Sequence, residues 1–200
     1  MVVYIPTAVS CRRIDKGPQI NNLYQLKKLG YYVDIVELAA LKPDVIKSAL
    51  EDADAIFVGG GDCFYLSYWM QKTGLFELLP KLLETKVYAG VSAGSMIVGG
   101  KENLRLAVPN EEIETISDVQ LNEYGPANES SSNTLQLVDF LMKVHLNSPG
   151  HLGQSDLGTF TETVSKIDSL IYVIDNQTAI KVIDDKIEVI SEGEWHLLNS

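Results

Sequence analysis

A serine in a glycine-rich turn is the residue best suited to carry chemistry in this sequence. Ser92 stands in residues 90–94 (GVSAG), which match the pattern Gly-x-Ser-x-Gly directly after the apolar run 87–91. In this context a nucleophilic serine sits on a sharp turn between a strand and a helix. Small neighbours permit the turn, and the amides that begin the helix can stabilise negative charge during acyl transfer. The pattern predicts that Ser92 is a nucleophile; the alternative is a tight turn with a helix-capping serine.

A serine hydroxyl needs a general base, and the chain contains three histidines. His145 follows the apolar run 137–142, just past an expected strand. His151 lies six residues later (151 − 145) in a segment with Pro and Gly. His196 lies in the C-terminal tail and is the weakest candidate. Spacing alone leaves His145 and His151 as nearly equal candidates.

A second glycine-rich loop occupies residues 57–62 (FVGGGD) at the end of another apolar run. Contiguous glycines can turn backbone N–H groups toward a phosphate or toward an oxyanion. The loop is neither a Walker A loop, which needs Gly-Lys-Ser/Thr, nor a dinucleotide fingerprint, whose glycines are spaced. Asp62 is a good N-cap for a following helix. A capped tight turn without any ligand is the alternative.

Composition narrows the class of protein. The 200 residues carry a net charge of −11 and no basic cluster, so we expect no nucleic-acid partner. The sequence has no signal-peptide pattern and no apolar run of about 18 residues, so we expect no membrane partner. Cys11 and Cys63 are too few for a disulfide scaffold and lack metal-ligand spacing. We therefore expect a cytoplasmic protein without a metal or another cofactor.

Apolar patterns place these motifs on an α/β framework. Strands are expected at 2–5, 32–38, 53–58 and 87–91, and helices at 19–29, 43–50 and 62–84 with a break near 73–74. This alternation predicts a parallel sheet with helices on both faces. Further strands are expected at 135–138, 170–174, 179–183 and 187–190, after an acidic surface excursion at 101–133 that is alternatively a lid. We interpret residues 1–200 as a single domain, because no linker or repeat divides them.

Four segments together resemble the dipeptidase E (alpha-aspartyl dipeptidase) family of serine peptidases. They are residues 57–75 (FVGGGDCFYL…KTGL), 88–98 (YAGVSAGSMIV), 137–149 (LVDFLMKVHLNSP) and 175–182 (DNQTAIKV). The resemblance implies a three-layer α/β sandwich with a mostly parallel central sheet. This is the flavodoxin-like fold of class I glutamine amidotransferases, with Ser where those enzymes have Cys. It also implies that the chain lacks the family's first strand and helix.

The resemblance implies roles for individual residues. It assigns the nucleophile to Ser92 and the base to His145, and it assigns the oxyanion donors to the N–H groups of Gly60 or Gly61 and of Ala93. It does not fix the acid that should orient the base, for which the candidates are Asp118, Glu111, Glu112 and Asp175. We expect Asp62 and His151 to lie at the substrate pocket. Residues 154–159 contain no arginine where the family grips a substrate carboxylate, so we expect no preference for an N-terminal Asp.

The resulting hypothesis is a serine peptidase that hydrolyses short peptides through an acyl-enzyme. Two other functions stay open at this point: a non-catalytic amidotransferase-like protein that binds a ligand or a partner, and an α/β-hydrolase esterase. The sequence is compatible with a homodimer but does not specify the oligomeric state.

Overall fold

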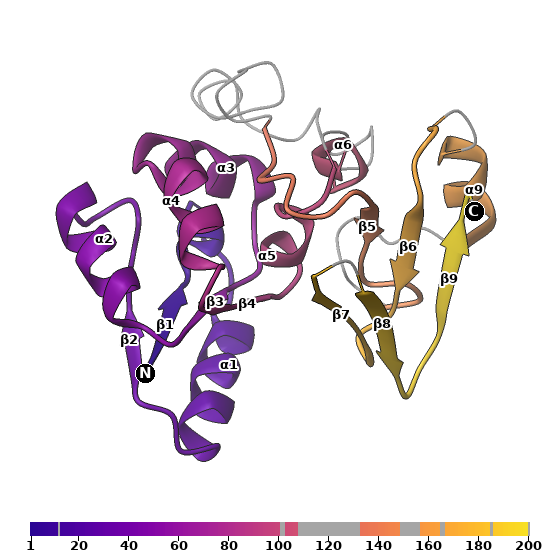
Figure 1. The fold of residues 1–200 in the computed structure, drawn as a ribbon. Coiled ribbons are helices and arrows are strands. Elements are labelled where there is room, and N and C mark those ends of the chain that lie inside the picture. Colours follow the sequence, from indigo (N-terminus) through magenta and orange to yellow (C-terminus); the bar gives the residue numbers. More distant parts are fainter. Residues whose placement is uncertain are drawn as a thin grey trace.

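Strands and helices alternate through the first half of the chain (Figure 1). The structure is a computed structural model, and it describes residues 1–11, 13–100, 103–107, 133–148, 157–164, 167–184 and 186–199. Four parallel strands pair in the order β2-β1-β3-β4, where β1 is Val2–Ile5, β2 is Val33–Ile35, β3 is Ala55–Val58 and β4 is Val87–Gly90. The short 3-10 helix η1 (Thr7–Val9) follows β1, and the connecting helices are α1 (Gly17–Lys28), α2 (Pro43–Asp52), α3 (Cys63–Lys72) and α4 (Leu75–Leu82).

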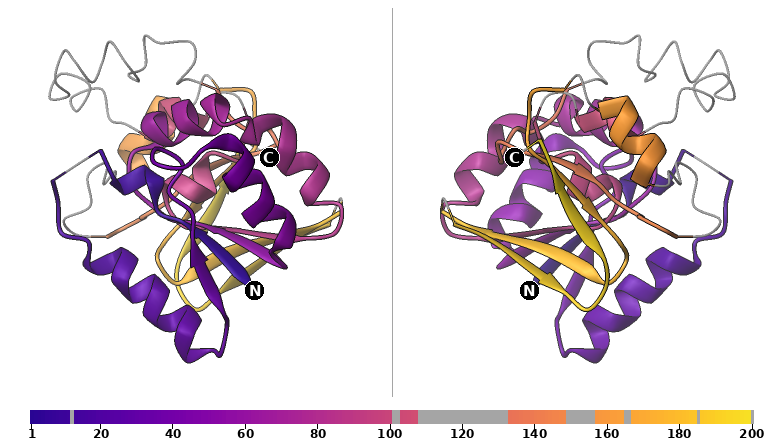
Figure 2. Two further views of the ribbon diagram at one scale, coloured as in Figure 1. Left: turned by 90° about the vertical axis from the view of Figure 1, so that its left-hand side faces the viewer. Right: turned by 90° about the vertical axis from the view of Figure 1, so that its right-hand side faces the viewer.

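The two faces of this sheet bury different helices. In β1 the side chains alternate between faces: Val2 and Tyr4 cluster with Leu26 of α1, whereas Val3 and Ile5 join the larger core that includes α2, α3 and α4. Figure 2 shows α1 on the side of the sheet opposite α2 and α4. The arrangement confirms the three-layer α/β sandwich with a parallel central sheet, a flavodoxin-like fold.

Local signals explain where the helices begin and end. Asp62 caps α3, with its Oδ1 accepting hydrogen bonds from Phe64 N at 3.0 Å and Tyr65 N at 2.9 Å. Gly74 separates α3 from α4 with a φ of 78°, a conformation that glycine adopts without strain. The expected break near residues 73–74 is therefore confirmed.

The second half adds two smaller sheets. Strands β5 (Leu141–Lys143) and β6 (Ile171–Ile174) are parallel, and β9 (Trp195–Leu198) pairs antiparallel with β6. Strands β7 (Thr178–Ile183) and β8 (Lys186–Ser191), near the strands expected at 179–183 and 187–190, pair antiparallel as a hairpin. Two helices, α6 (Asn103–Ala107) and α9 (Leu157–Val164), complete the described part of this half. Among the described helices, none has the length and apolar character needed to cross a bilayer.

The strand expected at 135–138 is wrong, because β5 begins only at Leu141. The amide of Leu135 donates to Ile97 O at 2.7 Å, and those of Leu137 and Val138 donate to Val98 O at 2.9 and 3.3 Å. These N–H groups donate to carbonyl groups that follow the turn holding Ser92. They therefore cannot donate to a neighbouring strand. The segment thus leads the chain from the end of the first sheet to β5.

The buried side-chain amide of Asn103 links the segment that follows Ser92 to β5 in the second half of the chain. Its Nδ2 donates to Met96 O and its Oδ1 accepts from Met142 N, both at 2.6 Å. Gly100 N adds a bond to Phe140 O at 3.0 Å. These contacts tie β5, and with it the residues that follow β5, to the segment that follows Ser92.

Candidate active site

Ser92 occupies a sharp turn between β4 and the short helix α5 (Ala93–Met96). Its φ is 53° and its ψ is −114°, a combination that costs a residue with a side chain about 1–3 kcal/mol. The turn is fixed on both sides, because Val91 N donates to Val58 O and Met96 N donates to Ser92 O, each at 3.0 Å. Strain that is held in this way is typical of a functional position.

The glycines of the motif are required by close backbone packing. A Cβ on Gly90 would lie 2.3 Å from Gly94 O, and a Cβ on Gly94 would lie 2.2 Å from Val58 O. Both distances are shorter than real Cβ contacts. Tyr88 supports the same turn by donating its hydroxyl to Gly94 O at 2.7 Å. Burial raises the pKa of Tyr88, so this hydroxyl stays protonated.

His145 lies beside Ser92, two residues after β5 ends. Its Nε2 is 3.0 Å from Ser92 Oγ, within hydrogen-bond reach. The backbone that carries the ring is fixed. His145 has a φ of 66°, and the amide of the next residue, Leu146, donates to Ile174 O at 3.0 Å. The structure thus brings together the two residues expected to act as nucleophile and base. His151, the competing candidate, lies outside the described residues.

The far nitrogen of the histidine meets an amide. His145 Nδ1 lies 2.7 Å from Asn176 Oδ1, where the sequence led us to expect a carboxylate. Of the four acids considered, Glu111, Glu112 and Asp118 lie outside the described residues. Sequence reasoning missed Asn176, although the residue belongs to the segment 175–182 that carries part of the family resemblance.

Asp175, the fourth acid considered, serves a different purpose. Its Oδ1 accepts from Gln177 N at 3.0 Å and from Thr178 Oγ1 at 2.7 Å, while its Oδ2 accepts from Glu194 N at 2.7 Å. Desolvation alone would raise the pKa of Asp175, but these hydrogen bonds outweigh it and hold the pKa below its ordinary value. The carboxylate therefore builds the turn that carries Asn176.

The glycine loop approaches the nucleophile directly. A Cβ on Gly60 would lie 2.9 Å from Ser92 Cβ. Gly61 has a φ of 143° and packs on the backbone of Ala8, whose carbonyl oxygen would lie 2.3 Å from an added Cβ. Within the described part of the chain, the N–H groups of Gly60, Gly61 and Ala93 have no hydrogen-bond acceptor. Three unpaired donors near a nucleophilic serine are suited to an oxyanion.

Two further side chains lie at this loop. Asp62 uses Oδ1 to cap α3, as its position after the glycines suggested, and its role at a substrate pocket stays a prediction. Gln19 of α1 places its Nε2 at 3.5 Å from Gly60 O. No sequence signal pointed to Gln19, because it looked like an ordinary polar residue at the start of a helix.

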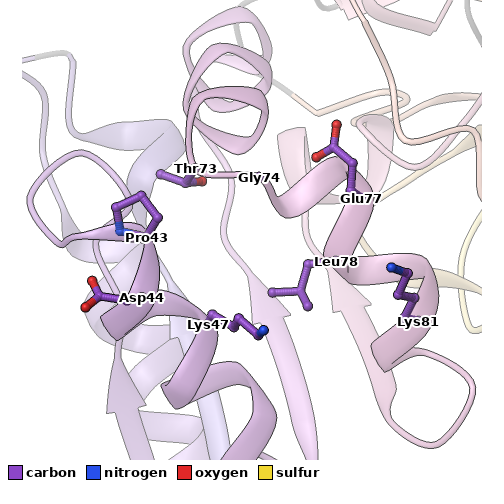
Figure 3. A pocket seen from close by; sticks show the side chains of 8 residues that line it. All are labelled: Pro43, Asp44, Lys47, Thr73, Gly74, Glu77, Leu78 and Lys81. Atoms are coloured by element: carbon purple, nitrogen blue, oxygen red, sulfur yellow. The ribbon is translucent and has the colours of Figure 1, made fainter.

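A shallow hollow of about 350 Å³ lies away from Ser92 and His145, between α2 and the start of α4. Asp44 and Lys47 line it from α2, and Glu77 and Lys81 line it from α4 (Figure 3). None of the residues expected at the active site lines this hollow. In the described part of the chain, no cluster of three or more His, Cys, Asp or Glu side chains could hold a metal ion.

A three-layer α/β sandwich with a strained serine just after one strand and a histidine just after another, in contact with each other, is an architecture typical of serine hydrolases. The family model for Peptidase family S51 matches residues 1–190, and the chain belongs to this family. It is accordingly a serine-type peptidase. The family match favours this prediction over an esterase or a non-catalytic binding protein.

Individual relatives agree with this assignment. The chain is 28% identical to an uncharacterized peptidase of Listeria innocua, covering 93% of this chain and 82% of that protein. It is 30% identical to Peptidase E of Shewanella denitrificans, and the aligned region covers 76% of this chain and 60% of the Shewanella protein. A solved structure of a Listeria monocytogenes protein named after Peptidase E superposes with a TM-score of 0.74 at 25% identity, covering 96% of this chain and 86% of that one.

Proposed function

We propose that this peptidase hydrolyses short peptides, with Ser92 as the nucleophile and His145 as the general base. The observation that carries the proposal is the 3.0 Å contact between Ser92 Oγ and His145 Nε2 at a strained turn. Peptides are proposed as substrates because relatives of this chain are named Peptidase E, and short ones because the motifs of the chain resemble the dipeptidase E family.

The chemistry follows from which atoms face one another. His145 Nε2 removes the hydroxyl proton as Ser92 Oγ forms a bond to the substrate carbonyl carbon. The oxyanion that forms can take hydrogen bonds from the N–H groups of Ala93 and of Gly60 or Gly61. His145 then returns the proton to the leaving amine as the peptide C–N bond breaks. Water then attacks the acyl-enzyme ester while His145 again acts as the base. This step releases the carboxylic acid product and restores the Ser92 hydroxyl.

Labelling with a fluorophosphonate tests the nucleophile separately from the substrate. We expect one adduct, located at Ser92 by peptide mass spectrometry, and none in Ser92→Ala. Ser95→Ala is the matched control, since Ser95 lies three residues away and uses its Oγ to bind Gly90 O at 2.8 Å. Labelling of Ser92→Ala at the wild-type rate would refute the assignment.

A library of dipeptides and tripeptides tests the substrate class, with the wild-type protein measured beside Ser92→Ala. Hydrolysis by the wild type alone supports the proposal. An adduct at Ser92 without hydrolysis of any member of the library would show that the nucleophile is correct and that short peptides are not the substrate.

A further inference from the structure

We propose that Asn176 is the positioning residue of this site, and that its amide oxygen fixes His145 in the tautomer that can accept the serine proton. The inference rests on the proposed function of Ser92 and His145. Two contacts of the His145 ring carry it: Asn176 Oδ1 lies 2.7 Å from His145 Nδ1, and His145 Nε2 lies 3.0 Å from Ser92 Oγ.

The contact selects one of the two neutral forms of the ring. An amide oxygen only accepts hydrogen bonds, so the proton must be on Nδ1 and the lone pair on Nε2. That lone pair faces the Ser92 hydroxyl and can receive its proton. With the amide reversed, Asn176 Nδ2 would donate to Nδ1, and the ring proton would sit on Nε2. A ring in that form donates to the serine and cannot act as its base.

The turn that carries Asn176 is well fixed. The carboxylate of Asp175 binds the amides on both sides of the turn, from Gln177 N at 3.0 Å and from Glu194 N at 2.7 Å. Asp175 N also donates to Glu194 O at 3.1 Å. Gly193 permits this approach, because a Cβ there would lie 1.9 Å from Asp175 Oδ2. The backbone of Asn176 is thus held between β6 and the turn before β9.

An amide differs from a carboxylate in charge as well as in geometry. A carboxylate beside Nδ1 would stabilise the imidazolium that forms during catalysis, whereas a neutral amide orients the ring without that charge. The nearby described acids have other partners. Asp175 binds backbone amides, and Glu194 binds Asn147 Nδ2 at 2.9 Å and His196 Nε2 at 2.8 Å. Replacing Asn176 by Asp should therefore raise the pKa of His145.

The experiment compares Asn176→Ala, Asn176→Asp and Gln177→Glu with the wild type. Gln177→Glu is the matched control, because it adds the same charge by the same isosteric change at the next exposed residue, whose contacts here are made by the backbone. For a dipeptide that the wild type hydrolyses, Asn176→Ala should lower kcat about 100-fold with little change in KM, as expected when a base is misplaced by about 1 Å. Asn176→Asp should keep kcat within about tenfold and move the acidic limb of the pH profile to higher pH. Gln177→Glu should resemble the wild type in both respects.

Nitrogen NMR of labelled histidine gives a readout that does not depend on hydrolysis. His145 is assigned by the signal lost in His145→Gln. We expect the Nδ1–H tautomer in the wild type, a loss of this preference in Asn176→Ala, and a raised pKa of His145 in Asn176→Asp but not in Gln177→Glu. Melting curves of each variant check that the fold is intact.

The outcomes separate this inference from the proposed function. An unchanged tautomer and unchanged pKa in the Asn176 variants would overturn the inference even if the wild type hydrolyses peptides. If the wild type hydrolyses nothing, the expected NMR changes still support the positioning role while the proposed function fails. Should Asn176→Ala not fold, Asn176→Asp and Gln177→Glu decide the question through the pKa of His145.

Discussion

Substitution of Gly60 by Ala should impair catalysis in a protein that still folds. The added Cβ would lie 2.9 Å from Ser92 Cβ, 3.4 Å from Ser92 Oγ and 3.4 Å from Val91 O. Carbon atoms pack best at about 3.5–4.0 Å, so the loop and the serine must separate by roughly 0.6 to 1 Å. The strand end cannot yield easily, because Val91 N is bonded to Val58 O at 3.0 Å. Most of the displacement should therefore fall on the serine side chain and on the loop.

The expected magnitude follows from that displacement. A reacting group moved by about 1 Å loses roughly 100-fold in rate, so kcat for Gly60→Ala should fall about 100-fold. Overpacking by one methyl group should lower the free energy of unfolding by about 1–3 kcal/mol. The measurements are kcat on a dipeptide and a urea unfolding curve for the same preparation.

Two other glycines, one adjacent to Gly60 and one between α3 and α4, act as controls for this prediction. Gly61→Ala would place a Cβ 2.3 Å from the backbone of Ala8 at a φ of 143°, so that variant should lose stability more severely than Gly60→Ala. Gly74→Ala has open space around the new Cβ and only a φ of 78° to accommodate, so it should cost about 1–2 kcal/mol of stability and leave kcat unchanged. A Gly60→Ala enzyme with wild-type kcat would refute the argument that the loop and the nucleophile are in contact.

Three further outcomes are expected. Ser92→Ala should lower turnover by several orders of magnitude at an almost unchanged melting temperature. Ser92→Gly should be equally inactive but more stable than Ser92→Ala by about 1 kcal/mol, because glycine tolerates a φ of 53°. Asp175→Asn should lower the melting temperature at neutral pH, and this deficit should vanish on acidification. The folded pKa of Asp175 is held low, so the stability it gives is present above an unfolded pKa of about 3.9 and is lost as the pH falls through the folded value; a deficit that does not shrink as the pH is lowered would contradict this. Asp-Leu should not exceed Ala-Leu by more than about tenfold in kcat/KM, because Asp62 adds negative charge beside the loop.

Much of the first sheet could be predicted from the sequence because its signals are local. The break between α3 and α4 at Gly74 and the cap of α3 at Asp62 each depend on the conformation of a few consecutive residues. The turn at Ser92 is similar, since Gly90 and Gly94 are needed by contacts within the motif and with the adjoining strand. Such patterns specify a structure without reference to distant parts of the chain.

The second half depends on long-range contacts, and there the pattern was not sufficient. The apolar run 137–142 is compatible with a strand at several registers. The register is decided by the carbonyl groups of residues 97 and 98, which accept hydrogen bonds from the amides of Leu135, Leu137 and Val138, so that β5 begins only at Leu141. Nothing within the run itself indicates that the amides of its first residues donate to a carbonyl group that follows α5.

The residue that orients His145 illustrates the same limit at the level of chemistry. Asp175 and Asn176 are neighbours, and general experience of serine hydrolases favours the carboxylate. Which of the two faces the base is decided by Glu194, 19 residues away from Asp175, whose amide binds the Asp175 carboxylate and leaves the next residue to meet His145. This choice requires a glycine at 193, where any side chain would collide with the carboxylate. The partner of the base is therefore set by the turn before β9, a segment without any catalytic motif, and a substitution at Gly193 should disturb the histidine without touching it.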